Sequence, residues 1–251
     1  MSFINKVVLV TGANSAIGEA VCLHFAKFSA RLSLVAKDPV KLKQVAAECE
    51  KISRLKVLTI ASDLSTHEEA QKAIDSTKHE FGRLDIIINC TGIYKHVNIL
   101  DADLIKVFDD VLTANLRSVV SVINCAAPML TESKGSIINI STCVYGALNS
   151  VPYNTFVGAL NHLTASVALD LAPTGIRVNS ISPGVKSNTL DAVSDQGESE
   201  AFSFADNTPL GKNVKSEDVV ELVVYLASDK ARSMTGGNYP VDAGLTFYGV
   251  A

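Results

Sequence analysis

The chain has 251 residues, 47% of them hydrophobic and 19% charged, which supplies the core of one α/β domain and excludes a disordered chain. A formal net charge of −4 without a basic cluster argues against nucleic acid as a main partner. Five scattered cysteines indicate free thiols. No signal peptide precedes the first strand pattern, and no apolar run reaches the roughly 18 residues of a membrane span. We therefore expect a cytoplasmic protein that does not bind membranes.

Short apolar runs alternate with amphipathic segments of helical length along the whole chain. This alternation is typical of βαβ units and predicts a single-domain Rossmann-type α/β fold over residues 1–251, a doubly wound parallel sheet of about seven strands with helices on both faces. Strands are expected at Lys6–Val10, Arg31–Ala36, Lys56–Ile60, Asp85–Asn89, Ser136–Ile140, Arg177–Ile181 and Asn238–Val241. Helices are expected near 17–28, 39–52, 67–81, 102–131, 152–172 and 216–228, two of them beginning at Pro39 and Pro152.

Residues 186–212 form the one long irregular segment, rich in Ser, Asp, Glu and Gly. Segments of this length in a compact domain are usually functional lids or disordered loops, and we expect a substrate lid here. Its apolar side chains indicate either an apolar substrate or partner surface, or packing of the lid itself; they are Leu190, Val193, Phe202 and Phe204.

A glycine-rich turn follows the first predicted strand and opens the first helix. Glycines permit a tight turn, and the helix N-terminus presents N–H groups and the positive end of its dipole to a pyrophosphate. The candidate cofactor-binding residues in this turn are Gly12, Asn14, Ser15, Ile17 and Gly18. The alternative is a plain βα turn without a ligand.

The chain resembles the short-chain dehydrogenase/reductase family, in particular its 3-oxoacyl-reductase-like branch. The resemblance rests on the glycine-rich turn, on the run from Gly135 to Gly184, and on Tyr153 at the start of a predicted helix. The resemblance covers essentially the whole chain and implies an NAD(P)-dependent oxidoreductase acting on small-molecule carbonyls or alcohols. It implies that Asp63 and Leu64 bind adenine, that Asn89 and Gly92 lie beside the adenosine ribose, and that Pro183 and Gly184 flank nicotinamide. Departures from the family pattern are Ala16 in place of a glycine, Cys90-Thr91 where Asn-Ala is usual, and Asn188 in place of a threonine.

The choice between NADP and NAD depends on the end of the second strand. An acidic side chain there would bind the ribose 2′-OH, and a base would bind a 2′-phosphate. Ala36 leaves the acidic position empty and Lys37 aligns with a base of NADP-selective relatives, so NADP(H) is favoured. A small shift in register would instead bring Asp38 to the ribose, so NAD(H) is possible, and Lys37 would then be an exposed loop charge.

The catalytic residues that the resemblance implies are Tyr153 as proton donor, Ser141 or Thr142 as the hydroxyl that polarises the substrate, and Asn115 as organiser of a proton-relay water. The family also has a lysine four residues after the tyrosine, on the same helix face, whose ammonium lowers the tyrosine pKa. Here that residue is Val157, so Tyr153 should titrate near the ordinary value of about 10, and activity should fall by roughly 10²–10⁴-fold. Lys95 and Lys186 are the candidates for a substitute cation, and an alternative for Tyr153 is a purely structural aromatic.

Two functions therefore remain open: a weakly active reductase or dehydrogenase, and a non-catalytic cofactor-binding protein with a regulatory or partner role. No metal site is expected, because the histidines lack ligand spacing. The predicted helices near 102–131 and 152–172 carry apolar residues on more than one face, which predicts a homo-oligomer, a dimer or a tetramer. The residues concerned are Val107, Val111, Leu116, Val119, Val122, Leu160, Leu163, Val167 and Leu171.

Overall fold

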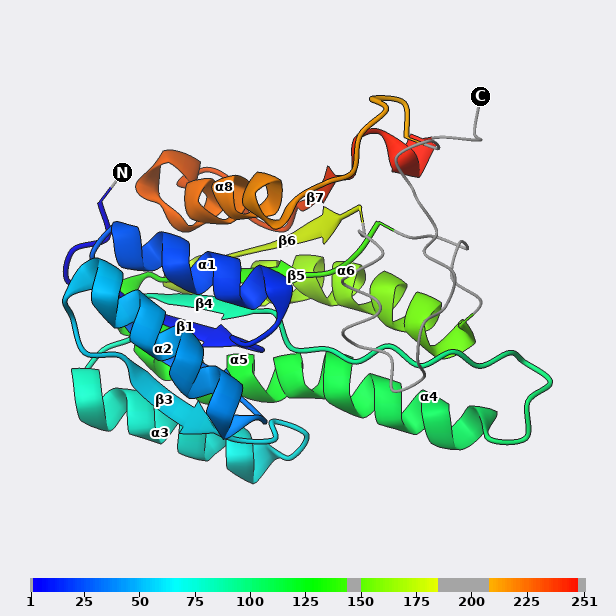
Figure 1. The fold of residues 1–251 in the computed structure, drawn as a ribbon, viewed down its shortest axis with the longest axis horizontal. Coiled ribbons are helices and arrows are strands. Elements are labelled where there is room, and N and C mark those ends of the chain that lie inside the picture. Colours follow the sequence, from blue (N-terminus) through cyan, green and yellow to red (C-terminus); the bar gives the residue numbers. More distant parts are fainter. Residues whose placement is uncertain (1, 144–149, 185–207, 248–251) are drawn as a thin grey trace.

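The computed structural model describes residues 2–143, 150–184 and 208–247, and the expected lid therefore lies almost wholly outside the described residues. Seven parallel strands form one sheet in the order β3-β2-β1-β4-β5-β6-β7 (Figure 1). This confirms the predicted Rossmann-type, doubly wound sheet. The strands are β1 (Val7–Thr11), β2 (Arg31–Ala36), β3 (Leu58–Ala61), β4 (Ile86–Asn89), β5 (Ser136–Ile140), β6 (Arg177–Pro183) and β7 (Asn238–Val241).

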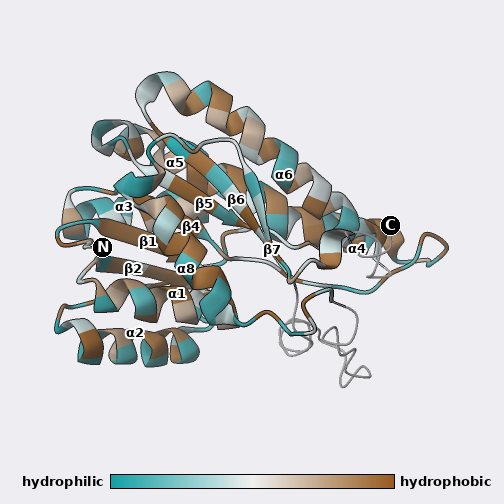
Figure 2. Cartoon of the chain, turned by 90° about the horizontal axis from the view of Figure 1, so that it is seen from above, coloured by the Kyte–Doolittle hydropathy of each residue, from teal (hydrophilic) through white to brown (hydrophobic). Residues whose placement is uncertain are grey.

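Helices cover both faces of the sheet, and the molecule has three layers when it is seen from above (Figure 2). One face carries α1 (Ala16–Lys27), α2 (Pro39–Ser53) and α8 (Ser216–Ala227). The other carries α3 (His67–Phe81), α4 (Leu104–Leu112), α5 (Ser118–Ser133) and α6 (Val151–Leu171). Three short 3-10 turns complete the described helices, at Ala172–Thr174, Asp229–Ala231 and Leu245–Phe247.

Side-chain caps start four of the helices that lead away from the carboxyl edge of the sheet. Ser15 caps α1, Asp38 caps α2, Thr66 caps α3 and Ser150 caps α6, each accepting a hydrogen bond from a backbone N–H of the first turn. Each of these caps fixes where its helix begins, and all four lie at the edge where parallel sheets bind ligands.

The predicted helix over 102–131 is instead three consecutive pieces. A π-helical turn at Thr113–Arg117 separates α4 from α5. β3 also begins two residues later than predicted, at Leu58, because the backbone N–H of Val57 donates to Glu50 Oε1 at the end of α2. The other elements agree with the prediction to within two residues.

The apolar residues that suggested a second partner surface belong to the core of the chain itself. Val107, Val111, Val119, Val122 and Leu160 are buried under the sheet, and the remaining four pack against them. These residues therefore give no argument for an oligomer, because one chain already buries them.

Candidate active site

Two cavities open at the carboxyl ends of the central strands, where the strand order reverses between β1 and β4. We call the first the tyrosine cavity; its volume is about 350 Å³ and Tyr153, Ser141, Thr142 and Asn115 all line it. The second, the Lys37 cavity, has about 540 Å³ and lies over the ends of β1, β2 and β3. One wall belongs to both cavities, and it is formed by Ser15, Ala16, Cys90, Thr91, Gly92 and Ile93.

The glycine-rich turn brings the first turn of α1 to this shared wall. Gly12 has a φ of +60°, and a Cβ on it would lie 2.5 Å from the carbonyl oxygen of Cys90. Ser15 Oγ donates to Gly12 O at 2.8 Å and accepts from Gly18 N at 3.1 Å, which closes the turn. Asn14 lines the Lys37 cavity and Ile17 the tyrosine cavity, so the N-terminus of α1 reaches both.

Gly18 and Asn89 are the two predicted cofactor residues that line neither cavity. A Cβ on Gly18 would lie 2.2 Å from Gly12 O, so this glycine permits close packing of the helix on the turn. Asn89 Nδ2 donates to Asn139 Oδ1 at 2.9 Å, and Asn139 Nδ2 donates to Thr164 Oγ1 at 3.0 Å. Asn89 therefore joins β4, β5 and α6 through a buried chain of polar side chains.

The Lys37 cavity has a lysine and an aspartate facing each other across the ends of β2 and β3. Lys37 Nζ lies 2.8 Å from Asp63 Oδ2. Partial burial of Asp63 opposes ionisation, but hydrogen bonds from Lys37 and Ser65 outweigh it and lower the pKa of Asp63. Leu64 lines the same cavity.

Asp38 lines the Lys37 cavity, and its carboxylate also binds the first turn of α2. Its Oδ1 accepts from the backbone N–H groups of Val40 at 2.9 Å and Lys41 at 3.2 Å. The carboxylate therefore caps α2, while the neighbouring Lys37 pairs with Asp63 in the same cavity.

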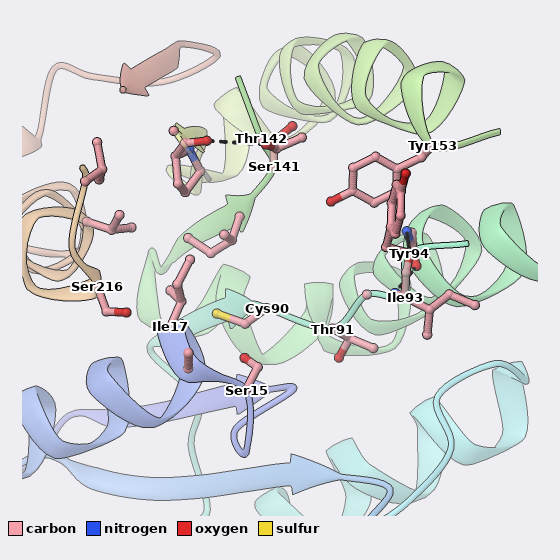
Figure 3. Close-up of a pocket in the computed structure, with 18 of the residues that line it drawn as sticks. Ser15, Ile17, Cys90, Thr91, Ile93, Tyr94, Ser141, Thr142, Tyr153 and Ser216 are labelled. Carbon is pink, nitrogen blue, oxygen red and sulfur yellow. Dashed lines mark hydrogen bonds between the residues drawn. The ribbon is translucent and has the colours of Figure 1, made fainter. Parts of the chain in front are cut away.

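Tyr153 stands in the first turn of α6 with its phenol directed into the tyrosine cavity (Figure 3). Its ring packs edge-on against Tyr94, with centroids 5.2 Å apart, and tilted against Phe156 at 5.5 Å. Burial, followed by the neighbouring Tyr94, raises the pKa of Tyr153 to about 12. The expected pKa near 10 is therefore wrong, because burial shields the phenol from water and disfavours the phenolate.

Val157 has no exposed surface and does not line the tyrosine cavity. It packs in the core beside Phe156 and Leu160, so α6 supplies no cation to the phenol. Of the substitute cations, Lys95 Nζ is paired with Asp110 Oδ2 at 2.9 Å, and Lys186 lies outside the described residues, as does Asn188. The charged residue that does line the tyrosine cavity is Lys215, just before α8, which the sequence did not single out.

The two hydroxyls after β5 differ in what they bind. Thr142 Oγ1 donates to the carbonyl oxygen of Pro183 at 3.3 Å (Figure 3). Ser141 Oγ is buried and has no hydrogen-bond partner among the described residues. Ser141 therefore has the hydroxyl that is available to a ligand in this cavity, and Pro183 and Gly184 form the wall beside it.

Asn115 lies in the π-helical turn and is fully buried. Its Oδ1 accepts from the N–H of Ile93 at 2.7 Å, and its Nδ2 donates to the carbonyl of Ile93 at 2.8 Å. The side chain thus holds the loop after β4 in place, and π-turns often mark such functional sites.

The residues present suit a dinucleotide that spans both cavities. The turn of α1 gives backbone N–H groups to a pyrophosphate, and two buried hydroxyls, Thr91 Oγ1 and Ser141 Oγ, have no partner in the described chain. The described residues contain no group of three or more His, Cys, Asp and Glu side chains that could hold a metal ion. Within the same residues, no helix is both long and apolar enough to cross a membrane.

Comparison with known proteins gives matches over nearly the whole chain. The family model described as enoyl-(acyl carrier protein) reductase matches residues 12–246. A (+)-borneol dehydrogenase of Salvia officinalis is 33% identical, over 98% of this chain and 91% of that protein. A short-chain type dehydrogenase/reductase of Mycobacterium ulcerans superposes with a TM-score of 0.89 at 26% identity, over 99% of this chain and 92% of the other. A 3-ketoacyl-(acyl-carrier-protein) reductase of Brucella melitensis, complexed with NADH, has a TM-score of 0.84 at 28% identity, over 98% of this chain and all of the other.

Proposed function

This chain belongs to the short-chain dehydrogenase/reductase family of oxidoreductases, and we propose that it binds NADP(H) and slowly reduces a small-molecule carbonyl. The observation that carries the proposal is the pair of cavities that share a wall. One has a buried phenol and a serine hydroxyl that has no partner among the described residues, and the other has a lysine at the end of β2. These are the groups that the two ends of a nicotinamide dinucleotide and its substrate require.

The chemistry assigned to the chain follows from three groups. A nicotinamide cofactor held in the two cavities would supply the hydride. Ser141 Oγ, which has no hydrogen-bond partner among the described residues, donates to the carbonyl oxygen and polarises it. Tyr153 then gives its phenolic proton to the same oxygen as negative charge develops there. Asn115 fixes the wall that the ligand lies against and is a positioning residue.

The raised pKa of Tyr153 keeps the phenol in the protonated form that reduction uses. With a pKa of about 12, Tyr153 is almost wholly protonated at neutral pH. Reduction uses the protonated phenol, whereas alcohol oxidation needs the phenolate as base. We therefore assign the protein to reduction, at a rate well below that of a site with a Tyr–Lys pair.

The decisive experiment measures carbonyl-dependent oxidation of NADPH with a reactive generic carbonyl. Tyr153→Phe should lower turnover by about a hundred-fold, because the proton donor is lost. Tyr94→Phe is the matched control, since Tyr94 packs against Tyr153 and lines the same cavity, and it should retain most of the activity. Turnover that is unchanged in Tyr153→Phe would refute the assigned proton donor.

The preference for NADP(H) rests on Lys37, whose neighbour Asp38 is occupied as a helix cap. Calorimetric titration should show NADPH binding about ten-fold more tightly than NADH, a difference of about 1.4 kcal/mol. Lys37→Ala should remove the difference, whereas Lys43→Ala, on the exposed side of α2, should preserve it. Equal affinity of the wild type for both nucleotides would contradict the assignment.

The second candidate is a non-catalytic cofactor-binding protein with a regulatory or partner role. Burial of Val157 in the core favours it, because an apolar side chain fills the position that the family's lysine would take. Tight NADPH binding without carbonyl-dependent oxidation, in both the wild type and Tyr94→Phe, would support this candidate over the first.

A further inference from the structure

The tyrosine cavity has a single charged residue among its described lining residues, and that residue is Lys215, directly before α8. No acidic side chain joins it in that lining. Lys215 is exposed, and within the described ranges its ammonium forms no ion pair. Ser141, which lines the same cavity, is 9% exposed, and its Oγ has no partner in the described chain. The cavity therefore presents a cation and a buried hydroxyl to a ligand.

The acidic residues next to Lys215 in the sequence are directed to the helix. Asp218 Oδ2 accepts from the backbone N–H of Lys215 at 2.9 Å, and this bond caps the first turn of α8. Asp218 and Glu217 are both exposed, and neither lines the tyrosine cavity or the Lys37 cavity. The positive charge of Lys215 at the tyrosine cavity is thus not matched by a carboxylate of that cavity's own wall.

The cation and the proton donor belong to different sides of the cavity. Figure 3 shows Ser216, the residue after Lys215, on the α8 side and Tyr153 on the α6 side. Apolar side chains, among them Ile17 and Ile140, line the same cavity. A ligand whose carbonyl reaches Tyr153 and which also reaches Lys215 must therefore extend across the cavity along an apolar wall.

The charge of Lys215 favours the substrate over the cofactor as its partner. The first turn of α1, which suits a pyrophosphate, contributes Ser15 and Ala16 to the wall that both cavities share, whereas Lys215 lines the tyrosine cavity alone. The end of the dinucleotide that would enter this cavity is the nicotinamide ring, which is neutral when reduced and positively charged when oxidised. An ammonium gains nothing from such a ring, so an anionic partner belongs to the carbonyl substrate.

An anion that enters a largely apolar cavity needs a cation there, because loss of its water is costly unless it is paired. The cavity of about 350 Å³ must also admit the nicotinamide ring, which favours a compact carboxylate over a bulkier phosphate ester.

We propose that Lys215 binds a carboxylate of the carbonyl substrate, at the end remote from the reacting carbonyl. The inference rests on the proposed carbonyl reduction and names its substrate class, oxo acids in which an aliphatic spacer separates the ketone from the carboxylate. Lys215 thereby determines specificity and takes no part in proton transfer.

The test titrates the NADP⁺-saturated protein with 5-oxohexanoate and with 5-oxohexanamide, which differ in the anionic group. The oxidised cofactor has no hydride to give, so calorimetry measures binding without turnover. Lys215→Gln should weaken binding of the acid about ten-fold, the loss of one charge-assisted hydrogen bond, and leave the amide within about two-fold. Lys215→Arg should keep the preference for the acid. Lys212→Gln, at an exposed lysine that lines neither cavity, is the control for net charge.

Equal affinity of the wild type for the acid and the amide would overturn the proposal, and so would an equal loss of both ligands in Lys215→Gln. If Lys215→Gln instead weakens NADP⁺ binding and leaves the preference for the acid unchanged, the partner of Lys215 is the pyrophosphate and the proposal is wrong.

Failure of the proposed function has a different signature. A wild type that prefers the acid but does not reduce it with NADPH would refute carbonyl reduction and leave the carboxylate site standing. A wild type without affinity for NADP⁺ would refute the cofactor assignment, and the acid and the amide are then compared on the free protein.

Discussion

Tyr153 and Val157 share one face of α6 but meet different surroundings. The phenol of Tyr153 lines the tyrosine cavity, whereas Val157 is packed among Phe156 and Leu160 in the core. Because the phenol is buried beside Tyr94 and no cation faces it from α6, its pKa rises instead of falling. We propose that valine at position 157 affects catalysis through the acid and cofactor binding through a missing ribose contact, and the two effects can be measured separately.

Val157→Lys should restore both functions of the missing ammonium. We expect carbonyl reduction to rise by at least ten-fold, a gain of about 1.4 kcal/mol in the barrier, because the cation stabilises the phenolate and binds ribose. Val157→Met is the matched control, since it lengthens the side chain without adding charge. Substantial wild-type turnover that stays constant or falls in Val157→Lys would show that the protein has an acid other than Tyr153.

The raised pKa of Tyr153 also predicts the pH dependence of the reverse reaction. The phenolate that oxidation requires increases about ten-fold per pH unit below the pKa of about 12. Initial rates of alcohol oxidation should therefore climb with that slope from pH 8 to about 10.5, without a plateau, while Tyr153→Phe shows no such climb. In Val157→Lys the plateau should move into the measured range. A wild-type plateau near neutral pH would mean that a cation already lowers the phenol pKa.

At the scale of elements, the alternation of apolar runs and amphipathic segments was sufficient to predict every described strand and the succession of helices. The π-helical turn was not predictable, because the helical period of apolar residues continues from α4 into α5 and the turn is stabilised by contacts of Asn115 with Ile93, which is distant in sequence. The choice between Ser141 and Thr142 likewise depended on the carbonyl of Pro183, on another strand. That most of the candidate residues would line the carboxyl edge of the sheet was thus predictable, whereas their hydrogen-bond partners required the tertiary structure.

Asn115→Ala tests whether this asparagine mainly stabilises the loop after β4. The substitution leaves the N–H and the carbonyl of Ile93 without their partners, so the free energy of unfolding should fall by about 2–4 kcal/mol, the sum of two part-buried hydrogen bonds. Urea unfolding would measure it. Asn124→Ala, at an exposed position of α5, should change stability by less than about 0.5 kcal/mol. A loss of activity in Asn115→Ala without loss of stability would instead support a direct role in catalysis.

At the scale of the whole molecule, the surface of α5 and α6 still presents apolar side chains after the core has been filled. Val120 on α5 is 44% exposed, and Leu169 on α6 is 77% exposed. Both helices cover the same face of the sheet (Figure 2). On α6, Gly158 has open space where a Cβ would stand, so the backbone of another molecule can approach closely there. The prediction that copies of the chain associate therefore rests on these exposed positions and not on the core residues of the same helices.

We therefore predict a homo-oligomer, a dimer or a tetramer, with α5 and α6 in the interface. Light scattering at micromolar concentration should give at least twice the mass of 26.6 kDa. Gly158→Trp fills the open space and Leu169→Lys places a charge on the apolar surface, so each should shift the mass toward the monomer. Leu100→Lys is the control, because Leu100 is 92% exposed in the loop between β4 and α4 and lies on neither helix. A monomer mass for the wild type would contradict the prediction, and the exposed residues of α5 and α6 would then be isolated apolar side chains, which are common on protein surfaces.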